Sequence, residues 1–156
     1  MERARHPKIR AQLPRLREIP RESSELLNAN DFTELQQLLS RYCHIVDTTA
    51  WDELDHIFTD DASVTVAGVY PTATGLAALR ELYARMNHPI AHTSSSVIVV
   101  EDGDARARLA SKWVTVRVDG STGTGVYEDV VERTPVGWRI RERVAKPAVP
   151  ARPVPA

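Results

Sequence analysis

The chain has little of what extracellular and membrane proteins depend on. A single cysteine, Cys43, occurs in 156 residues, which excludes an intrachain disulfide and favours a reducing compartment. No stretch approaches the roughly 20 apolar residues that a membrane-spanning helix needs, and no apolar signal-peptide core follows the N-terminus. We therefore expect a soluble, cytoplasmic protein with a buried thiol.

The sequence also lacks an excess of charge of one sign. A formal net charge of -1 and a pI near 6.5 give no overall electrostatic reason to expect nucleic acid or an anionic membrane as a partner. An apolar fraction of 42% suffices for one domain whose core needs neither a metal nor disulfides.

Several common catalytic motifs are absent from the sequence. It contains no glycine-rich phosphate loop, no nucleophile elbow and no Cys-x-x-Cys pair. Among the five histidines, His88 and His92 have the one spacing typical of a metal site, but Pro89 prevents both from lying on one helix face. We expect neither a metal nor another cofactor.

The two ends of the chain differ in composition from its middle. Residues 1–27 are a predicted flexible leader, whose first 22 residues hold seven basic and three acidic side chains. A basic arm for an acidic partner is the alternative interpretation. Residues 146–156 carry four prolines and are expected to form an extended, disordered tail. The functional domain is predicted to span residues 28–145.

Apolar spacing predicts helices at the start of this domain. The first begins near Asp31, capped by Asn30 or by Asp31 itself, and its apolar residues recur every three or four positions up to Val46. Thr49 resembles the start of a capping box, which favours a second helix that ends before Asp60.

Strand signals dominate the rest of the domain. A short β-branched run at 63–67 and a loop at 68–75 lead to a third helix, which the His88-Pro89 step ends. Four strand-like stretches follow, at 91–101, 105–118, 123–133 and 138–144. Helices followed by an antiparallel meander indicate an α+β fold.

The last of these stretches alternates between apolar and basic residues. Alternation places Arg139, Arg141 and Arg143 on one face of the strand, away from its apolar side chains. We expect these three arginines to be solvated or to form the rim of a subunit contact.

Two stretches of sequence carry a resemblance to a known family. They are RYCHIVDTTAWDELDHIFTDDASV, from Arg41, and GVYEDVVERTPVGWRI, from Gly125. Over residues 30–145 the chain resembles the nuclear transport factor 2-like superfamily, in its SnoaL-like branch of polyketide cyclases and dehydratases. The resemblance implies an α+β cone-shaped barrel, with three N-terminal helices packed on a curved, mainly antiparallel sheet, an apolar pocket and a homodimer. It implies less about chemistry, because this fold hosts enzymes, carriers and association domains.

The resemblance also implies candidate catalytic residues. Lindane dehydrochlorinase is similar in placing an Asp at the position of Asp47 and its catalytic His in a segment that matches His92; there the pair removes a proton from carbon. Scytalone dehydratase also has an Asp that matches Asp47. Ketosteroid isomerase is similar around Tyr42 and Asp129, which resemble its oxyanion-binding pair. Val66 stands where that isomerase has its basic Asp, which argues against the same reaction.

These residues suit proton transfer. A histidine is an effective base near neutral pH, and a carboxylate on its second ring nitrogen fixes its tautomer. We predict His92 as the base, Asp47 as its orienting partner, and Tyr42 with Asp129 as the groups that polarise a substrate oxygen. The alternatives are structural: Asp47 can cap the helix junction, His92 and Tyr42 can be core residues, and Asp129 can pair with Arg133 on the same strand face.

The predicted function is that of a cofactor-independent lyase or isomerase, of the dehydratase or cyclase type. Its substrate is expected to be a small hydrophobic metabolite, for which a polyketide-like compound is one option. The predicted substrate-binding residues are Trp51, Val66, Trp113, Tyr127 and Arg133. A non-catalytic binding or association module of the same fold is the main alternative, and a small subunit of a ring-hydroxylating oxygenase is a third.

Overall fold

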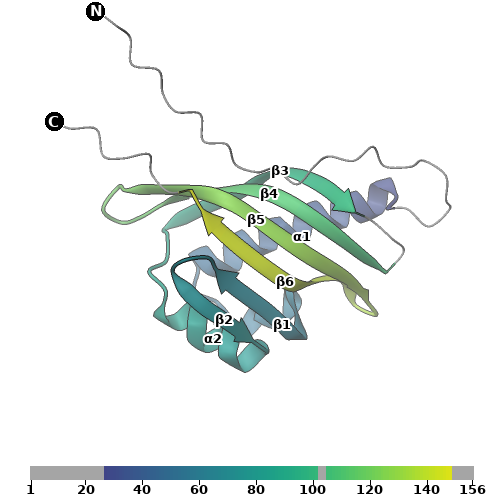
Figure 1. Ribbon diagram of the computed structural model, residues 1–156, viewed down its shortest axis with the longest axis horizontal. Helices are drawn as coiled ribbons and strands as arrows, with labels where there is room; N and C mark the ends of the chain where they lie inside the picture. Colours follow the sequence, from purple (N-terminus) through teal and green to yellow (C-terminus); the bar gives the residue numbers. More distant parts are fainter. Residues whose placement is uncertain (1–26, 102–104, 149–156) are drawn as a thin grey trace, which may run out of the picture.

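Figure 1 shows the computed structural model, which describes residues 27–101 and 105–148. Its elements are helix α1 (Ala29–Asp47), the 3₁₀ helix η1 (Trp51–His56), strands β1 (Phe58–Val66) and β2 (Tyr70–Thr74), helix α2 (Leu76–Arg85), and strands β3 (Ala91–Glu101), β4 (Arg106–Val116), β5 (Thr122–Thr134) and β6 (Gly137–Pro147). The fold is α+β, as predicted.

The six strands form one twisted sheet in the order β2-β1-β6-β5-β4-β3. All neighbours are antiparallel except β1 and β6, which run parallel. The last strand therefore lies in the middle of the sheet, between the meander β3–β5 and the β1–β2 hairpin. Side chains on the inner face of β6 consequently lie near residues from both halves of the chain.

The N-cap of helix α1 lies two residues before the first of the two predicted caps. Asn28, rather than Asn30 or Asp31, is the N-cap: its side chain accepts hydrogen bonds from the backbone N–H groups of both residues, while Asp31 accepts from Asn28 N–H. This reciprocal capping box fixes the helix start. The predicted apolar stripe is buried from Leu35 to Val46, whereas its first residue, Phe32, is exposed. Helix α1 packs against β3 and β6. The helix ends at Asp47, next to Thr49 with a φ of 55°.

The other two predicted helices differ from expectation. The second is the short 3₁₀ helix η1, whose N-cap Ala50 makes no side-chain hydrogen bond, so the predicted capping box at Thr49 is wrong. The pair Asp60–Asp61 lies within β1 and does not follow a helix. The third helix, α2, comes after two strands, and β2 occupies most of the predicted loop at 68–75. Three consecutive N-terminal helices are therefore not present in the described part of the chain.

A β-bulge in β6 overturns the predicted arginine face. Val131 pairs with Ile140 and Val130 pairs with Glu142, so Arg141 is an extra residue on β6. A bulge of this kind reverses the alternation of the side chains beyond it. Ile140 faces the core before the bulge and Arg143 faces the core after it, with an exposed fraction of 1%. Arg143 is therefore not part of a solvated face.

One apolar core lies between the helices and the inner face of the sheet. Its largest apolar members come from α1, η1, β1, α2, the meander and β6, and include Leu35, Phe58, Tyr83 and Ile140. At roughly 1.5–3 kcal/mol for each fully buried large apolar side chain, this core supplies the main stabilising contribution. No helix in the described part of the chain is long and apolar enough to span a membrane.

The predicted domain limits concern residues at and beyond the ends of the described structure. Strand β6 continues through Lys146 and Pro147, which pair with Val126 and Gly125, so the sheet extends two residues past the predicted limit at 145. The predicted leader up to residue 26 and the predicted tail from 149 lie outside the described residues.

Candidate active site

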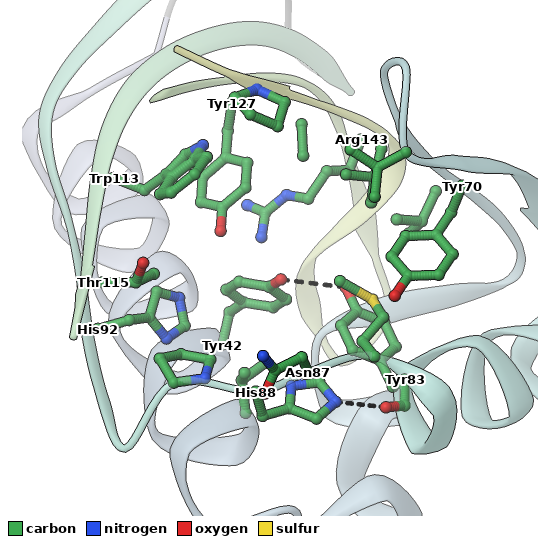
Figure 2. Close-up of a pocket in the computed structure, with 18 of the residues that line it drawn as sticks. Tyr42, Tyr70, Tyr83, Asn87, His88, His92, Trp113, Thr115, Tyr127 and Arg143 are labelled. Atoms are coloured by element: carbon green, nitrogen blue, oxygen red, sulfur yellow. Dashed lines mark hydrogen bonds between the residues drawn. The ribbon is translucent and has the colours of Figure 1, made fainter. Parts of the chain in front are cut away.

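A partly open cavity of about 370 Å³ is lined by residues of α1, of α2 and the segment after it, of the β1–β2 hairpin, and of the inner faces of β3–β6 (Figure 2). Most of its wall is apolar or aromatic. The wall also includes four nitrogen-bearing ionisable side chains: His88, His92, Arg117 and Arg143. A wall of this composition favours an apolar ligand that carries a few polar atoms.

The structure brings together Asp47 and His92, which are 45 positions apart in the sequence. Asp47 is the last residue of α1, and His92 is the second residue of β3. One carboxylate oxygen, Oδ1, lies 3.0 Å from His92 Nδ1, and the other, Oδ2, accepts the His92 backbone N–H at 3.0 Å. The two contacts fix both the strand end and the imidazole ring.

The hydrogen bond to Asp47 determines the tautomer of His92. A carboxylate only accepts hydrogen bonds, so Nδ1 carries the proton and Nε2 carries the lone pair. Nε2 is buried without a hydrogen-bond partner among the described residues, and the His92 side chain is 1% exposed in the cavity wall. Burial lowers the pKa of His92, and its hydrogen bond to Asp47 opposes this shift only in part. His92 is therefore a neutral base near pH 7.

Asp129 does not lie in the cavity wall, and its partner is Arg143 rather than Arg133. Arg143 Nε and Nη2 donate to the two Asp129 carboxylate oxygens at 2.8 and 2.7 Å. Both side chains are fully buried. The predicted role of Asp129 in polarising a substrate oxygen is therefore wrong, because both of its oxygens face the guanidinium.

Arg143 is the cavity residue that Asp129 positions. Its guanidinium carbon lies 4.0 Å from the Tyr42 ring centroid and 4.1 Å from that of Tyr127, so the cation is held between two aromatic rings. Burial by itself would lower the pKa of Arg143, but the charge and hydrogen bonds of Asp129 outweigh it and hold the pKa above its ordinary value. Arg143 is a permanent cation in the cavity wall.

Tyr42 occupies the space between the proposed base and this cation. Its ring makes an edge contact with the His92 ring, at a centroid distance of 5.4 Å. The Tyr83 hydroxyl donates to the Tyr42 hydroxyl at 3.2 Å, which leaves the Tyr42 proton available to another acceptor. Burial raises the pKa of Tyr83 and of Tyr127, which keeps both phenols protonated.

The predicted substrate-binding residues divide into two groups. Val66, Trp113 and Tyr127 line the cavity. Trp51 does not: its ring stacks on Tyr83 at 5.6 Å and lies 4.6 Å from the His88 ring, outside the cavity wall. Aromatic character alone cannot distinguish a residue in a wall from one that packs behind it.

Arg133 is also remote from the cavity. It forms an ion pair with Asp31 at the start of α1, and its guanidinium carbon lies 4.5 Å from the centroid of the Trp138 ring. Trp138 Nε1 donates to the same Asp31 at 3.3 Å. This cluster joins α1 to the sheet, and its role is structural.

The model of the SnoaL-like domain family matches residues 28–144, which is most of the chain. The match includes every residue of the cavity wall except Ala145 and Pro147. The chain belongs to this family. Its membership agrees with the α+β fold and with the resemblance in the sequence.

Several known proteins are similar to this SnoaL-like domain over most of their length. Uncharacterized protein Rv2910c of Mycobacterium tuberculosis is 30% identical over 129 residues, 74% of this chain and 84% of the relative. An NTF2-like protein with a cystatin-like fold from Novosphingobium aromaticivorans is 25% identical, with a TM-score of 0.68 over 78% of this chain and 84% of that one. A candidate aromatic ring hydroxylase from the same organism is 27% identical, with a TM-score of 0.65 and coverage of 80% and 93%.

Several polar residues of the SnoaL-like cavity, His88 and Arg143 among them, are missing from the predicted site. The sequence pattern assigns His88 only to the end of a helix, yet it lies in the cavity wall, with Nε2 against the Tyr83 carbonyl oxygen. The same kind of pattern places Arg143 on a solvated face. The buried position of Asp129 is the one sequence signal for Arg143, because a buried carboxylate needs a cation.

A metal site has no support among residues 27–101 and 105–148. No cluster of three or more histidine, cysteine or acidic side chains in this part of the chain has the geometry to hold an ion.

Proposed function

We propose that this SnoaL-like domain is a lyase or isomerase of the dehydratase or cyclase type, which removes a proton from carbon without a cofactor. The observation that supports this most is the state of His92: its Nδ1 is bonded to Asp47 at 3.0 Å, and its buried Nε2 has no partner among the described residues of the cavity wall. A base held in one tautomer with its lone pair toward a cavity is the arrangement that general base catalysis requires.

Proton transfer in this site conserves charge at every step. The C–H bond of the substrate breaks, its proton goes to His92 Nε2, and its electron pair stays on the substrate. Asp47 stabilises the imidazolium that forms. In a lyase the electron pair forms a double bond as a leaving group departs from the next carbon, whereas in an isomerase the proton returns at another carbon.

The wall of the cavity supports a small hydrophobic substrate. Val66, Trp113 and Tyr127 present apolar surface, and Tyr42 has a hydroxyl proton for a substrate oxygen. Of the two residues predicted to polarise an oxygen, Tyr42 keeps this role in the proposal and Asp129 does not.

Deuterium exchange into a simple ketone tests the proposal directly. The probe is 2-tetralone, a two-ring ketone with a weakly acidic C1–H, incubated with the protein in D₂O and followed by NMR. We expect exchange above the buffer rate, and its loss in His92→Gln. His56→Gln is the matched control, since His56 is exposed on η1 and should leave the rate unchanged. Binding of the ketone without exchange would instead favour the non-catalytic module.

A further inference from the structure

One part of the cavity wall is a short segment that belongs to no helix or strand. Residues 86–90 connect α2 to β3 (Figure 1), and Met86, Asn87, His88 and Pro89 all line the cavity. Asn87 is also exposed to solvent. The segment therefore has the cavity on one side and solvent on the other, so its displacement would open the cavity.

Few backbone hydrogen bonds hold this segment in place. At one end the Met86 N–H donates to the Tyr83 carbonyl oxygen at 3.2 Å, and at the other the Ile90 N–H donates to the Val116 carbonyl oxygen at 2.9 Å. The three residues between these ends make no backbone–backbone hydrogen bond within residues 27–101 and 105–148. Segments with few such bonds open at a lower free-energy cost than the core of a domain does.

The His88 side chain holds the middle of the segment. Its Nε2 donates to the Tyr83 carbonyl oxygen in the last turn of α2, as the dashed line in Figure 2 shows. A carbonyl only accepts hydrogen bonds, so Nε2 carries the proton, and the C-terminal end of a helix favours a donor. The imidazole centroid also lies 4.6 Å from that of the Trp51 ring and 6.2 Å from that of the Tyr83 ring.

Trp51 is the fixed surface against which His88 packs. Its ring stacks on Tyr83 at 5.6 Å, and its carbonyl oxygen accepts from Arg80 Nε at 3.2 Å. These contacts tie Trp51 to α2, where Tyr83 is 1% exposed. Trp51 does not line the cavity, so an effect of Trp51 on the cavity has to pass through a neighbour such as His88.

We propose that residues 86–90 form a lid over the cavity and that His88, packed against Trp51, is the latch that keeps the lid closed. When His88 leaves this position, it gives up its hydrogen bond to Tyr83 and its ring contacts, and the segment between the two end hydrogen bonds moves toward solvent. Lids of this kind control access to a site. The latch controls access for any ligand, so this inference goes beyond the proposed function and does not depend on it.

Hydrogen exchange of backbone amides tests the latch without a ligand. We expect His88→Ala to speed exchange at the Met86 and Ile90 amides by about tenfold or more, the range for losing one hydrogen bond and one aromatic contact. The amide of Val131, a fully buried residue of β5, reports global unfolding and should not follow. His56→Ala is the matched control, since His56 is exposed on η1. Unchanged rates at Met86 and Ile90 in His88→Ala would refute the latch.

A double-mutant cycle tests whether His88 and Trp51 act as one unit. Trp51→Ala should speed exchange at the same two amides, and His88→Ala/Trp51→Ala should add little to either single change, because residues that share a contact are not additive. Trp51→Phe keeps an aromatic ring and should retain most of the protection. If Trp51→Ala does not fold, Trp51→Leu takes its place. Effects that multiply in the double variant would show that the two side chains act separately.

Binding kinetics distinguish a latch from a ligand contact. The probe is 2-naphthol, a fluorescent two-ring compound, followed by stopped flow. A latch changes access in both directions, so His88→Ala and Trp51→Ala should raise the association and dissociation rate constants by the same factor of about ten, with Kd unchanged within about twofold. A rise in the dissociation rate constant alone would assign His88 to ligand contact and overturn the inference.

The latch and the proposed function fail in different experiments. Absence of deuterium exchange into 2-tetralone would refute the enzyme and leave the amide exchange rates of the lid unaffected. Unchanged amide exchange in His88→Ala would refute the latch and leave the His92 base in place. If 2-naphthol does not bind, the amide exchange rates decide.

Discussion

Replacing Asp47 by asparagine preserves the shape of the side chain but changes what it can offer His92. The carboxylate uses both oxygens, one toward Nδ1 and one toward the backbone N–H, each at 3.0 Å. Asparagine has a single oxygen, and its other terminal atom is a donor. If the oxygen keeps the backbone N–H, the amide group donates to Nδ1. The ring proton then moves to Nε2, and His92 presents a donor to the cavity where it had presented a lone pair.

The expected effects on rate and stability differ by several kcal/mol. Loss of the base tautomer and of the compensating charge should slow exchange by about 10²- to 10⁴-fold, which corresponds to about 2.7–5.5 kcal/mol in the activation free energy. The free energy of unfolding should fall by only about 1 kcal/mol. The asparagine still accepts one hydrogen bond, from the His92 backbone N–H, and donates another, to Nδ1. The Asp47 side chain is also 22% exposed, so solvent reaches the site of the change.

The assay compares initial rates of deuterium exchange into 2-tetralone with its Kd and with the melting temperature. Asp61→Asn is the matched control, since Asp61 is a 60% exposed side chain on β1 that pairs with Arg141 away from the cavity. We expect Asp47→Asn and His92→Gln to bind the ketone but to exchange it slowly. Exchange at the full rate in both variants would show that the base is another residue.

Three further outcomes are expected. Because burial lowers the pKa of His92 below its ordinary 6.5, kcat/KM for exchange should be constant near pH 7 and should fall only below pH 6.5; an acid limb centred above 6.5 would contradict this. The unfolded chain binds that proton more readily, so His92 should also reduce stability as the pH falls through this range. Deleting residues 1–26 and 149–156 should leave the melting temperature nearly unchanged, and a large drop would show that an end is docked. Gly125→Ala should cost about 1–3 kcal/mol in urea unfolding, because an added Cβ would come within 2.5 Å of the Trp113 ring; an unchanged midpoint would refute that contact.

The sequence predicted most elements whose periodicity is long and regular. The stripe of α1, the three strands of the meander β3–β5, and β6 agree with the prediction to within a few residues. The error at η1 arose because a six-residue segment contains too few turns for a period to be read. The resemblance to known enzymes, rather than any local pattern, pairs Asp47 with His92 at the level of sequence, since 45 positions separate them.

The sequence by itself determined most of the helical and extended segments and most of their apolar faces, because these patterns repeat along the chain. Its motifs also determined the family to which the domain belongs. Only the tertiary structure decided which polar residues meet. One extra residue, Arg141, turns Arg143 from the outer to the inner face of β6, where Arg143 pairs with Asp129 and lines the cavity. A bulge of this kind is set by pairing with β5 on one side and β1 on the other. Its energy depends on contacts between distant segments, so no local pattern encodes it.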